Sequence, residues 1–462
     1  MKFARYVCAV MCVLALGAVL IACGSSNDAS NMNTPPAKAM SAVAVYGQDA
    51  PLASVITFQM TLTGLTASDG VNTTTLLSAP QTVDFAKLTG LRTLLDLNSA
   101  PAGSYTSITL TVANPVIGYL NVSSGNPTTI NMLNGTLTTS TITVLMNPPL
   151  VLTSDNLNGL RLDFDMRQSL QVDLNGQITG TIVPTFDIRQ VNPDNAEAEI
   201  DDLRGGVVSV NTANQSFVMQ IANGRQITVQ IGPTTVTDNG DALSTFNTNT
   251  IVDVSGELNR TTMVLAADEV AVLTQDHFVA EGLITGVQPP TSTDAQFDLF
   301  VRDALPANPA FQPDTIAAFD ASSSARFLIC RLNLPITQLL FNSQSLITGQ
   351  GVTVGGALNG SSLTVKRVVL HRQGIYGPWV VGSTVIQNGN TGTFQINEKG
   401  IVGVVLNAPL TVLTSDATEF DGLSGLRALS GNTPIPLHVV GLLLQNPQTG
   451  TPVFVARRVY TP

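Results

Sequence analysis

The chain of 462 residues carries 32 acidic against 21 basic residues, which gives a formal net charge of −11. Sparse Lys and Arg in an acidic chain argue against binding nucleic acid or anionic lipid headgroups. Charged residues make up only 11% of the chain, and Thr, Asn, Ser, Gln and Gly fill the polar positions instead. That composition is typical of an exported β-protein with Thr on strand faces and Asn and Gly in turns.

Residues 1–22 have the order of a secretory signal peptide. Two basic residues precede an uncharged apolar run from Tyr6 to Ile21, which is short for a bilayer span of about 20 apolar residues. The site Leu20-Ile21-Ala22-Cys23 resembles the lipobox of bacterial lipoproteins. The resemblance implies cleavage before Cys23, lipidation of its thiol and acylation of its new amine. Two alternatives stay open: an uncleaved N-terminal membrane helix, and cleavage without lipidation.

Cys23 is the residue to which the sequence assigns a definite role. Two or more acyl chains anchor a protein stably, so a lipidated Cys23 would hold the chain at a membrane without a spanning helix. Gly24 occupies the position where Asp marks inner-membrane retention in many lipoproteins, so the resemblance implies the outer membrane or cell surface. Residues 23–41 are rich in Ser, Asn, Pro and Ala and predict a flexible tether. Cys330 is expected to be a buried strand residue.

Beyond the tether, no long segment carries the 3.6-residue apolar stripe of a helix. Short alternating runs recur instead, as in residues 56–62 and 107–112, and each is bounded by Gly, Pro, Asn or Asp. Short strands at regular spacing indicate a sandwich or barrel. Helix is expected only in short pieces such as Thr82 to Leu91.

Residues 42–191 are expected to form one β-sandwich. The run from Leu160 to Leu170 alternates between apolar and charged side chains. Together with residues 45–51 (VYGQDAP) and 102–110 (AGSYTSITL), it resembles the bacterial family called domain of unknown function 4382. That family runs from V-x-D-A-P through P-A-G-x-Y to L-D-F-D-x-x-x-S. The resemblance implies an exported, all-β, prealbumin- or carbohydrate-binding-like sandwich without known catalytic residues.

The remaining sequence predicts a linker and three repeats. Residues 192–202 are polar and acidic, which indicates a linker. A strand with a central Gly then recurs at three places, and each is followed by a polar turn and a second apolar strand. The three places are residues 252–258, 352–358 and 437–443. A Gly in mid-strand fits a sharp bend at a barrel corner. The expected β-barrel repeats span residues 203–274, 278–372 and 376–462.

These repeats resemble the family called domain of unknown function 5666, whose pattern is G-x-I, F-x-V, T-x-F, V-x-V-x-G and A-x-x-V. The first repeat fits best, through residues 217–219, 235–237 and 267–270, whereas the second and third are eroded. The expected fold class is therefore all-β, with an N-terminal β-sandwich followed by about three small β-barrel-like repeat units.

The sequence holds no motif of a known catalytic or metal site. Each of the three histidines outside the signal, His277, His371 and His438, is expected to be structural or solvent-facing. Asp163 and Asp165 share one strand face, a spacing that suits glycosidase chemistry, although paired acids on a strand are usually a solvated face.

Two further motifs have competing interpretations. Ser154 to Asp165 mimics the spacing of an EF-hand loop, but its flanks resemble strands, so a β-turn is the better interpretation. Trp379, the single Trp, and Tyr376 are expected to pack between the last two units, with a sugar site as the alternative.

The sequence predicts a non-enzymatic, lipid-anchored envelope or surface protein that acts as a binding, adhesion or display module. Its partners would be the membrane, through Cys23, and a protein or glycan, with no cofactor, no metal and no nucleic acid. An envelope assembly or transport-associated accessory lipoprotein, docked on a membrane complex, is the alternative. A hydrolase with an unrecognised site is the third hypothesis.

Overall fold

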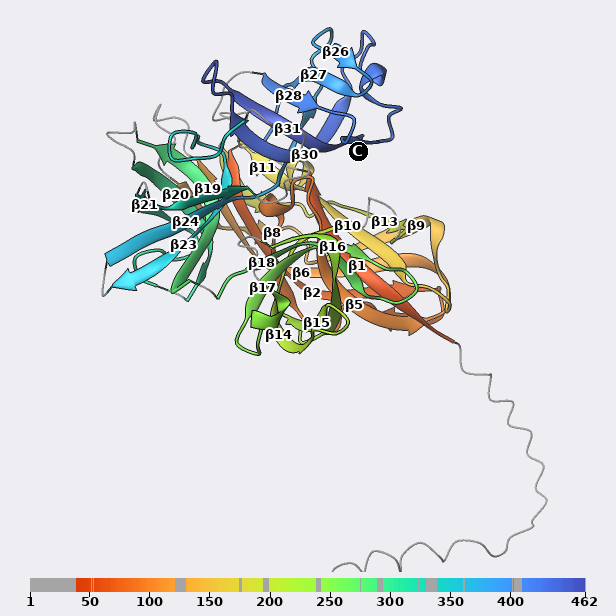
Figure 1. Cartoon of the computed structure of the whole chain (residues 1–462). Helices are drawn as coiled ribbons and strands as arrows, with labels where there is room; N and C mark the ends of the chain where they lie inside the picture. Colours follow the sequence, from red (N-terminus) through yellow and green to blue (C-terminus); the bar gives the residue numbers. More distant parts are fainter. Residues whose placement is uncertain are drawn as a thin grey trace, which may run out of the picture. The chain divides into compact units, whose positions relative to one another are not determined.

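The described residues of the computed structural model fold almost entirely into β-strands (Figure 1). The structure describes residues 39–461 except 51, 53, 121–129, 174–176, 194–198, 238–241, 275, 289–293, 307, 323, 330–338, 360–361, 401 and 403–408. The expected signal peptide, Cys23, most of the tether and Cys330 therefore lie outside the described residues. Within the described ranges, no helix is long and apolar enough to cross a membrane.

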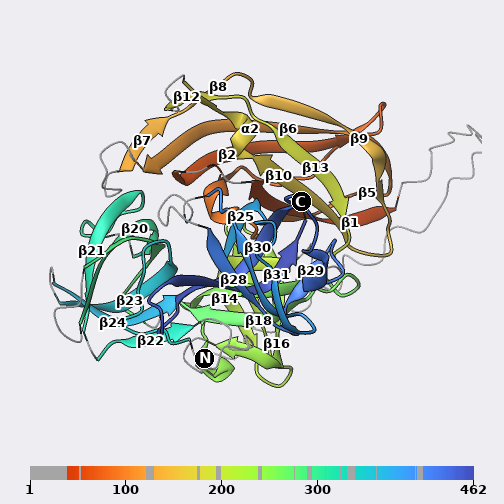
Figure 2. The same cartoon turned by 90° about the horizontal axis from the view of Figure 1, so that it is seen from above.

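The N-terminal sandwich is built from two large sheets, which Figure 2 shows as stacked layers. The first has the order β13-β10-β1-β5, with strands β1 (Met40–Ala50), β5 (Thr93–Pro101), β10 (Asn158–Asp165) and β13 (Phe186–Val191). The second has the order β3-β2-β6-β7, with β4 paired to β2 and β9 to β6. Its strands are β2 (Val55–Ser68), β3 (Thr73–Thr75), β4 (Gln81–Asp84), β6 (Gly103–Leu120), β7 (Ile130–Asn134) and β9 (Thr141–Leu152).

The sandwich core explains the alternation seen in the sequence. Leu162 and Phe164 of β10 point into the core, whereas Arg161 and Asp163 face the other way. Phe164 stacks on Phe58 of β2, with ring centroids 4.9 Å apart, so the two sheets meet through their aromatic side chains. A small third sheet lies beside them, with strands β8 (Thr136–Leu137), β11 (Leu170–Val172) and β12 (Ile178–Ile182).

The helix expected from Thr82 to Leu91 is a single turn. The first residues belong to β4, and a 3₁₀ helix, η1 (Phe85–Leu88), follows. Its buried residues, Phe85 and Leu88, account for the amphipathic pattern. Asp84 caps η1 by accepting the backbone N–H of Ala86, and Gly90, with a φ of +66°, stands where the chain turns away.

A closed five-stranded barrel follows, in the order β14-β15-β16-β18-β17. The strands are β14 (Glu199–Asn211), β15 (Ser216–Ile221), β16 (Gln226–Thr237), β17 (Ile251–Leu258) and β18 (Leu265–Val272). Counted along the chain, this order is 1-2-3-5-4, with the third strand parallel to the fifth. It is the strand order of the small Greek-key barrel known as the OB-fold.

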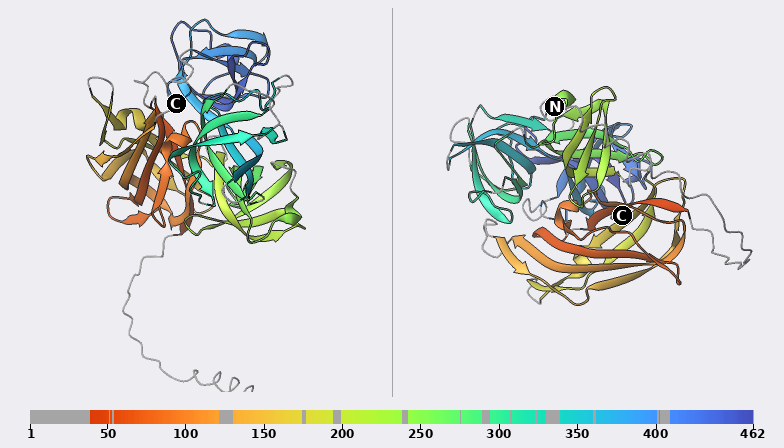
Figure 3. Two further views of the ribbon diagram at one scale, coloured as in Figure 1. Left: turned by 90° about the vertical axis from the view of Figure 1, so that its left-hand side faces the viewer. Right: turned by 90° about the horizontal axis from the view of Figure 1, so that it is seen from below.

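The second unit is a six-stranded sheet in the order β21-β20-β19-β23-β24-β22. Its strands are β19 (Phe278–Val287), β20 (Ala295–Leu305), β21 (Thr315–Ala321), β22 (Arg326–Ile329), β23 (Gly351–Asn359) and β24 (Ser362–Leu370). As in the barrel, its last strand, β24, pairs antiparallel with β23 on one side and parallel with β22 on the other. Figure 3 shows that each C-terminal unit keeps its own block of strands.

The third unit is a seven-stranded sheet in the order β25-β30-β31-β28-β27-β26, with β29 paired to β31. Its strands are β25 (Gln373–Pro378), β26 (Val385–Asn388), β27 (Thr391–Ile396), β28 (Leu410–Thr414), β29 (Glu419–Asp421), β30 (Pro436–Gln445) and β31 (Pro452–Tyr460). β31 is antiparallel to β30 and parallel to β28. In all three units, therefore, the last strand pairs antiparallel with the strand before it and parallel with an earlier strand.

The recurring central glycines occupy the same structural position in all three units. Each lies at a register shift in the pairing of the last two strands of its unit. A β-carbon at any of them would lie closer than 3.0 Å to a carbonyl oxygen of the neighbouring strand. The three pairs are Gly256 with Ala266, Gly356 with Thr364, and Gly441 with Val455. The repeated Gly therefore marks a β-bulge at which two backbones approach closely.

The prediction of a linker at residues 192–202 is wrong for its last four residues, which form the start of strand β14. β14 begins at Glu199 and pairs with β17 from its first residue. Glu199 and Asp201 are buried, with 1% and 4% of their surface exposed. Their charges indicated a solvated segment, but arginines from distant parts of the chain neutralise them, as described below.

Candidate functional site

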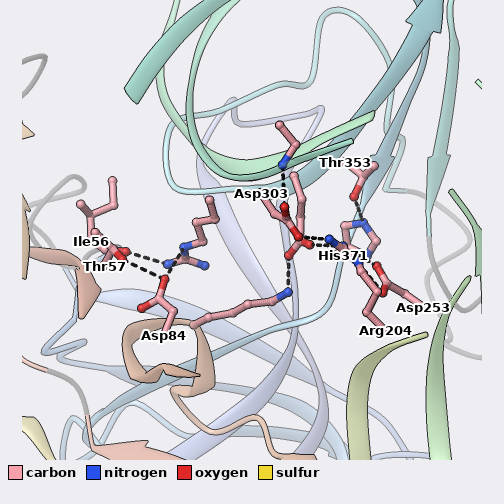
Figure 4. Close-up of polar contacts among 12 residues, drawn as sticks. Ile56, Thr57, Asp84, Arg204, Asp253, Asp303, Thr353 and His371 are labelled. Carbon is pink, nitrogen blue, oxygen red and sulfur yellow. Dashed lines mark hydrogen bonds and ion pairs between the residues drawn. The ribbon is translucent and has the colours of Figure 1, made fainter. Parts of the chain in front are cut away.

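Three clusters of charged side chains and one cavity are candidate sites. The first cluster surrounds Glu281 of β19, and Figure 4 labels its members Arg204, Asp253 and Asp303. Glu281 pairs with Lys87 of η1 and, at 3.0 Å, with Arg204 of β14. Arg204 also pairs with Asp253 of β17, at 2.8 Å, and with Asp303 of β20. Burial alone would raise the pKa of Glu281, but the charges of Lys87 and Arg204 hold it well below its usual value. The cluster therefore fastens the sandwich, the barrel and the second sheet to one another.

Two smaller contacts flank this cluster in Figure 4. The Oγ1 of Thr353 in β23 lies 2.6 Å from the Nε2 of His371, which directly follows β24. On the sandwich side, Arg302 of β20 donates to the carbonyl oxygen of Ile56, and the hydroxyl of Thr57 donates to Asp84. His371 is thus engaged with a neighbouring hydroxyl.

The second cluster surrounds Glu199 at the start of β14. One carboxylate oxygen lies 2.9 Å from Arg372, and the other pairs with Arg457 and Arg458 of β31. Arg372 also reaches Asp201 at 3.0 Å. Although burial works against ionisation, these cations hold the pKa of Glu199 well below its usual value. The cluster therefore ties the barrel to the third sheet.

The third cluster covers the face of β1 and β10 that points away from the sandwich core. Arg92 donates to Gln48 at 2.8 Å, and its guanidinium lies 5.3 Å from the ring centroid of Tyr460. Burial raises the pKa of Asp163 to about 6. On the opposite face of β1, where Asp49 lies beside Phe164 in the register, burial also raises the pKa of this fully buried carboxyl well above its usual value. Shifted carboxylates are common at active sites, but they also occur in structural networks.

His438 of β30 completes this third cluster. Its ring lies between those of Tyr376 and Tyr460, with centroids 4.7 and 4.9 Å away. Burial, reinforced by the charges of Arg92 and Arg161, lowers its pKa to about 3. A neutral imidazole held between two aromatic rings is a packing element.

The cavity lies on the outer face of the third sheet and has a volume of about 400 Å³. Its lining comes from β26, β27, β28 and β31, from the turn between β30 and β31, and from Leu339 of the second unit. The lining residues are Leu339, Gln387, Thr391, Gly392, Thr393, Leu413, Thr414, Ser415, Asn446, Pro447, Gln448, Val455 and Ala456. Sequence reasoning missed this site; the signal was the run of polar residues at alternate, outward positions of β27.

The structure does not assemble Asp163 and Asp165 into an open pair. Asp165 caps the short helix α2 (Met166–Ser169) by accepting the backbone N–H of Gln168 at 2.9 Å. Asp163 is half-buried and accepts from the side chain of Gln48. The two carboxylates therefore have separate structural uses.

The calcium-like run also has a structural explanation. The part from Asn158 onward is strand β10, and the Asn158 side chain donates to Ser41 at 2.7 Å and to the carbonyl oxygen of Thr153 at 3.0 Å. In the parts of the chain that the structure describes, no group of three or more His, Cys, Asp or Glu residues could hold a metal ion.

The expected packing of Trp379 and Tyr376 between the last two units is wrong. Trp379 is 1% exposed, lies within the core of the third unit, and donates its Nε1–H to Thr384 at 3.1 Å. Tyr376 faces His438 of its own unit and Arg167 of the sandwich. A buried indole offers no platform for a sugar.

Comparison with known proteins supports the N-terminal domain. A family model described as "Domain of unknown function (DUF4382)" matches residues 40–180, in agreement with the resemblance seen in the sequence. No curated protein matches the chain. Among solved structures, one titled "drosophila Unr CSD456" is 10% identical, covers 56% of this chain and 97% of its own, and has a TM-score of 0.15. That score is too low to support a common fold.

Proposed function

We propose that this chain is an exported lipoprotein of the bacterial cell envelope, placed at the outer membrane or cell surface, whose β-units form a binding module. The observation that carries the proposal is the order of the first 41 residues: an apolar run, the site Leu20-Ile21-Ala22-Cys23, and a polar segment rich in Ser, Asn, Pro and Ala. A diacylglycerol on the Cys23 thiol together with an acyl chain on its amine would supply the two or more chains that stable anchoring requires.

The described body supports a binding role in two ways. The charged clusters around Glu199 and Glu281 join its sheets, as a rigid platform at the end of a tether requires. The two carboxylates with glycosidase-like spacing, Asp163 and Asp165, serve a buried network and a helix cap. We therefore propose a non-enzymatic role, with the three units as members of the family called domain of unknown function 5666.

The anchor is tested by changing Cys23 to Ala in the full chain and expressing it in a bacterium with two membranes. The wild type should incorporate labelled palmitate and fractionate with the outer membrane. The variant should lose the label and leave the membrane fraction. Cys330→Ala is the matched control, because it removes the other cysteine beyond the signal peptide and should keep both properties. A Cys23→Ala protein that stays labelled and membrane-bound contradicts the proposal.

The alternative role, an accessory lipoprotein docked on a membrane complex, predicts a fixed protein partner. Crosslinking of intact cells followed by detergent extraction should then recover one defined envelope complex with this chain. A free display or binding module should be recovered without one.

A further inference from the structure

We propose that the cavity on the third unit binds a neutral oligosaccharide. This inference rests on the proposed role as a binding module and names the class of ligand. It starts from the position of the cavity, which lies on the face of the third sheet that points away from that unit's own hydrophobic core. Phe394 of β27 and Val412 of β28 point into that core, whereas the alternate residues Thr393 and Leu413 line the cavity.

The floor of the cavity is a row of three residues in register. Thr393 lies opposite Leu413, and Leu413 lies opposite Val455 on the parallel strand β31. The row thus offers the hydroxyl of Thr393 and the partly buried side chain of Leu413, whereas Val455 is 3% exposed and packs in the core of the second unit. A pyranose ring has the same mixed character, because its C–H faces are apolar and its rim carries hydroxyl groups.

Two amide-bearing segments form the walls. Gln387 lies at the register shift in the pairing of β26 with β27. On the other side, the turn after β30 holds itself in place, since the Asn446 side chain accepts the backbone N–H of Gln448 at 2.9 Å and the Asn446 N–H donates to Thr451. These hydrogen bonds hold the turn in place and position Gln448 at the cavity rim, and they do not involve the Gln448 side chain.

Several lining side chains have unused hydrogen-bonding capacity. Within the described part of the chain, the side chains of Gln387, Thr391, Thr393 and Gln448 make no hydrogen bond to another residue. Each amide both donates and accepts, and each hydroxyl does the same. Sugar hydroxyls need partners of this kind, and a volume of about 400 Å³ falls within the range of small-ligand sites.

The lining also excludes other ligand classes. It contains no Lys, Arg, Asp or Glu, and the chain carries a net charge of −11, so a phosphate or sulfate group would find no counter-charge. Single-stranded nucleic acid needs a positive groove and aromatic side chains for stacking, and the lining has neither. A neutral ligand with many hydroxyl groups remains.

The strand order gives independent support. In barrels with this order, the face of strands two and three and the loop between strands four and five bind oligonucleotides or oligosaccharides. The third unit is an open sheet with additional strands, and in it β27, β28 and the turn between β30 and β31 hold the corresponding places around the last strand and line the cavity. Because the cavity lining is uncharged, it favours an oligosaccharide over an oligonucleotide.

The test uses the purified full chain in detergent micelles. Its probes are neutral tri- and tetrasaccharides built from glucose, mannose, galactose or N-acetylglucosamine, with a heparin tetrasaccharide and a 20-nucleotide dT strand as anionic probes. Isothermal titration or a glycan array should show binding of at least one neutral probe and of neither anionic probe. The double variant Gln387→Ala/Gln448→Ala should weaken that binding about tenfold, because each lost hydrogen bond contributes modestly.

Gln395→Ala is the matched control. Gln395 is an outward amide on the same strand, β27, but it lies outside the cavity lining, so its loss should leave the affinity unchanged. Far-UV circular dichroism and the fluorescence of Trp379 check that each variant is folded. The inference is overturned if no neutral probe binds at millimolar concentration, if only the anionic probes bind, or if the double variant binds as tightly as the control.

These outcomes are separate from those of the anchor experiment. If Cys23 is palmitoylated but no saccharide binds, the ligand assignment is wrong and the anchor proposal stands. If a saccharide binds but the protein carries no palmitate label, the anchor proposal is wrong and the ligand site stands.

Discussion

At the scale of single residues, the recurring glycines show how a sequence signal and a backbone requirement coincide. Gly256 lies on a bulge between β17 and β18, where a β-carbon would collide with the carbonyl oxygen of Ala266. The same collision would occur at the two equivalent glycines. The spacing of these glycines could be read from the sequence because the backbone, rather than a distant side chain, sets the requirement.

Changing Gly256 to Ala should therefore destabilise the protein by about 1–3 kcal/mol, the usual cost of overpacking. Gly206 of β14 is a matched control in the same barrel, since a β-carbon there meets nothing within 4 Å. Gly206→Ala should stabilise by about 0.4–1 kcal/mol, because it restricts the unfolded chain. Urea unfolding of the two variants measures the difference, and equal midpoints would contradict the assignment of the bulge.

His438 makes the stability of the folded body depend on pH. Its pKa falls from 6.5 to about 3 on folding, so between these values the unfolded chain binds a proton that the folded chain does not. Its contribution is fully present above pH 6.5 and is lost as the pH falls towards 3, by at most about 1.4 kcal/mol per pH unit. The raised pKa of Asp163 has the opposite effect on stability. Between pH 3.8 and about 6 the folded chain binds a proton there that the unfolded chain does not, so this carboxyl stabilises the fold as the pH falls.

Replacing His438 by Phe keeps a ring between Tyr376 and Tyr460 and removes the titrating group. Relative to wild type, the variant should gain stability steadily as the pH falls from 6.5 to 4. Unfolding midpoints measured at half-unit steps of pH test this, and taking the difference from wild type removes the contribution of Asp163. Parallel curves for the two proteins would show that His438 does not titrate in this window.

At the scale of elements, the first strand of the barrel shows where sequence reasoning fails. Strand periodicity predicted most of the β-structure, because alternation is a local property. Glu199 and Asp201 resembled a solvated linker, because their partners, Arg372, Arg457 and Arg458, lie more than 170 positions away. The cavity on the third sheet was missed for the same reason, since its lining runs from Leu339 to Ala456, which are 117 positions apart (456 − 339).

The start of β14 should therefore depend strongly on one carboxylate. Glu199→Gln leaves Arg457 and Arg458 without their buried counter-ion and should cost about 3–5 kcal/mol. The exposed pair of Asp187 with Arg189, 3.0 Å apart, provides the control, and Asp187→Asn should cost less than about 1 kcal/mol. Chemical unfolding of both variants checks the contrast. A small cost at Glu199 would mean that water solvates the cluster.

At the scale of the whole described body, the charged clusters link parts that the sequence separates into a sandwich and three units. Lys87 of the sandwich and Arg204 of the barrel converge on Glu281 of the second sheet. Tyr460 of the third sheet reaches Gly90 of the sandwich at 3.3 Å. Residues 39–462 form one compact unit, and contacts of this kind between units favour cooperative unfolding over independent melting.

The single Trp makes that cooperativity measurable. Trp379 is buried in the third unit, so its fluorescence follows that unit alone, whereas far-UV circular dichroism follows every strand. In wild type the two urea transitions should coincide. Glu281→Gln removes the charge that joins the sandwich, the barrel and the second sheet, so its dichroism transition should start earlier and spread wider than its fluorescence transition. Non-coincident transitions already in wild type would mean that the units unfold separately and that the clusters contribute little to joining them.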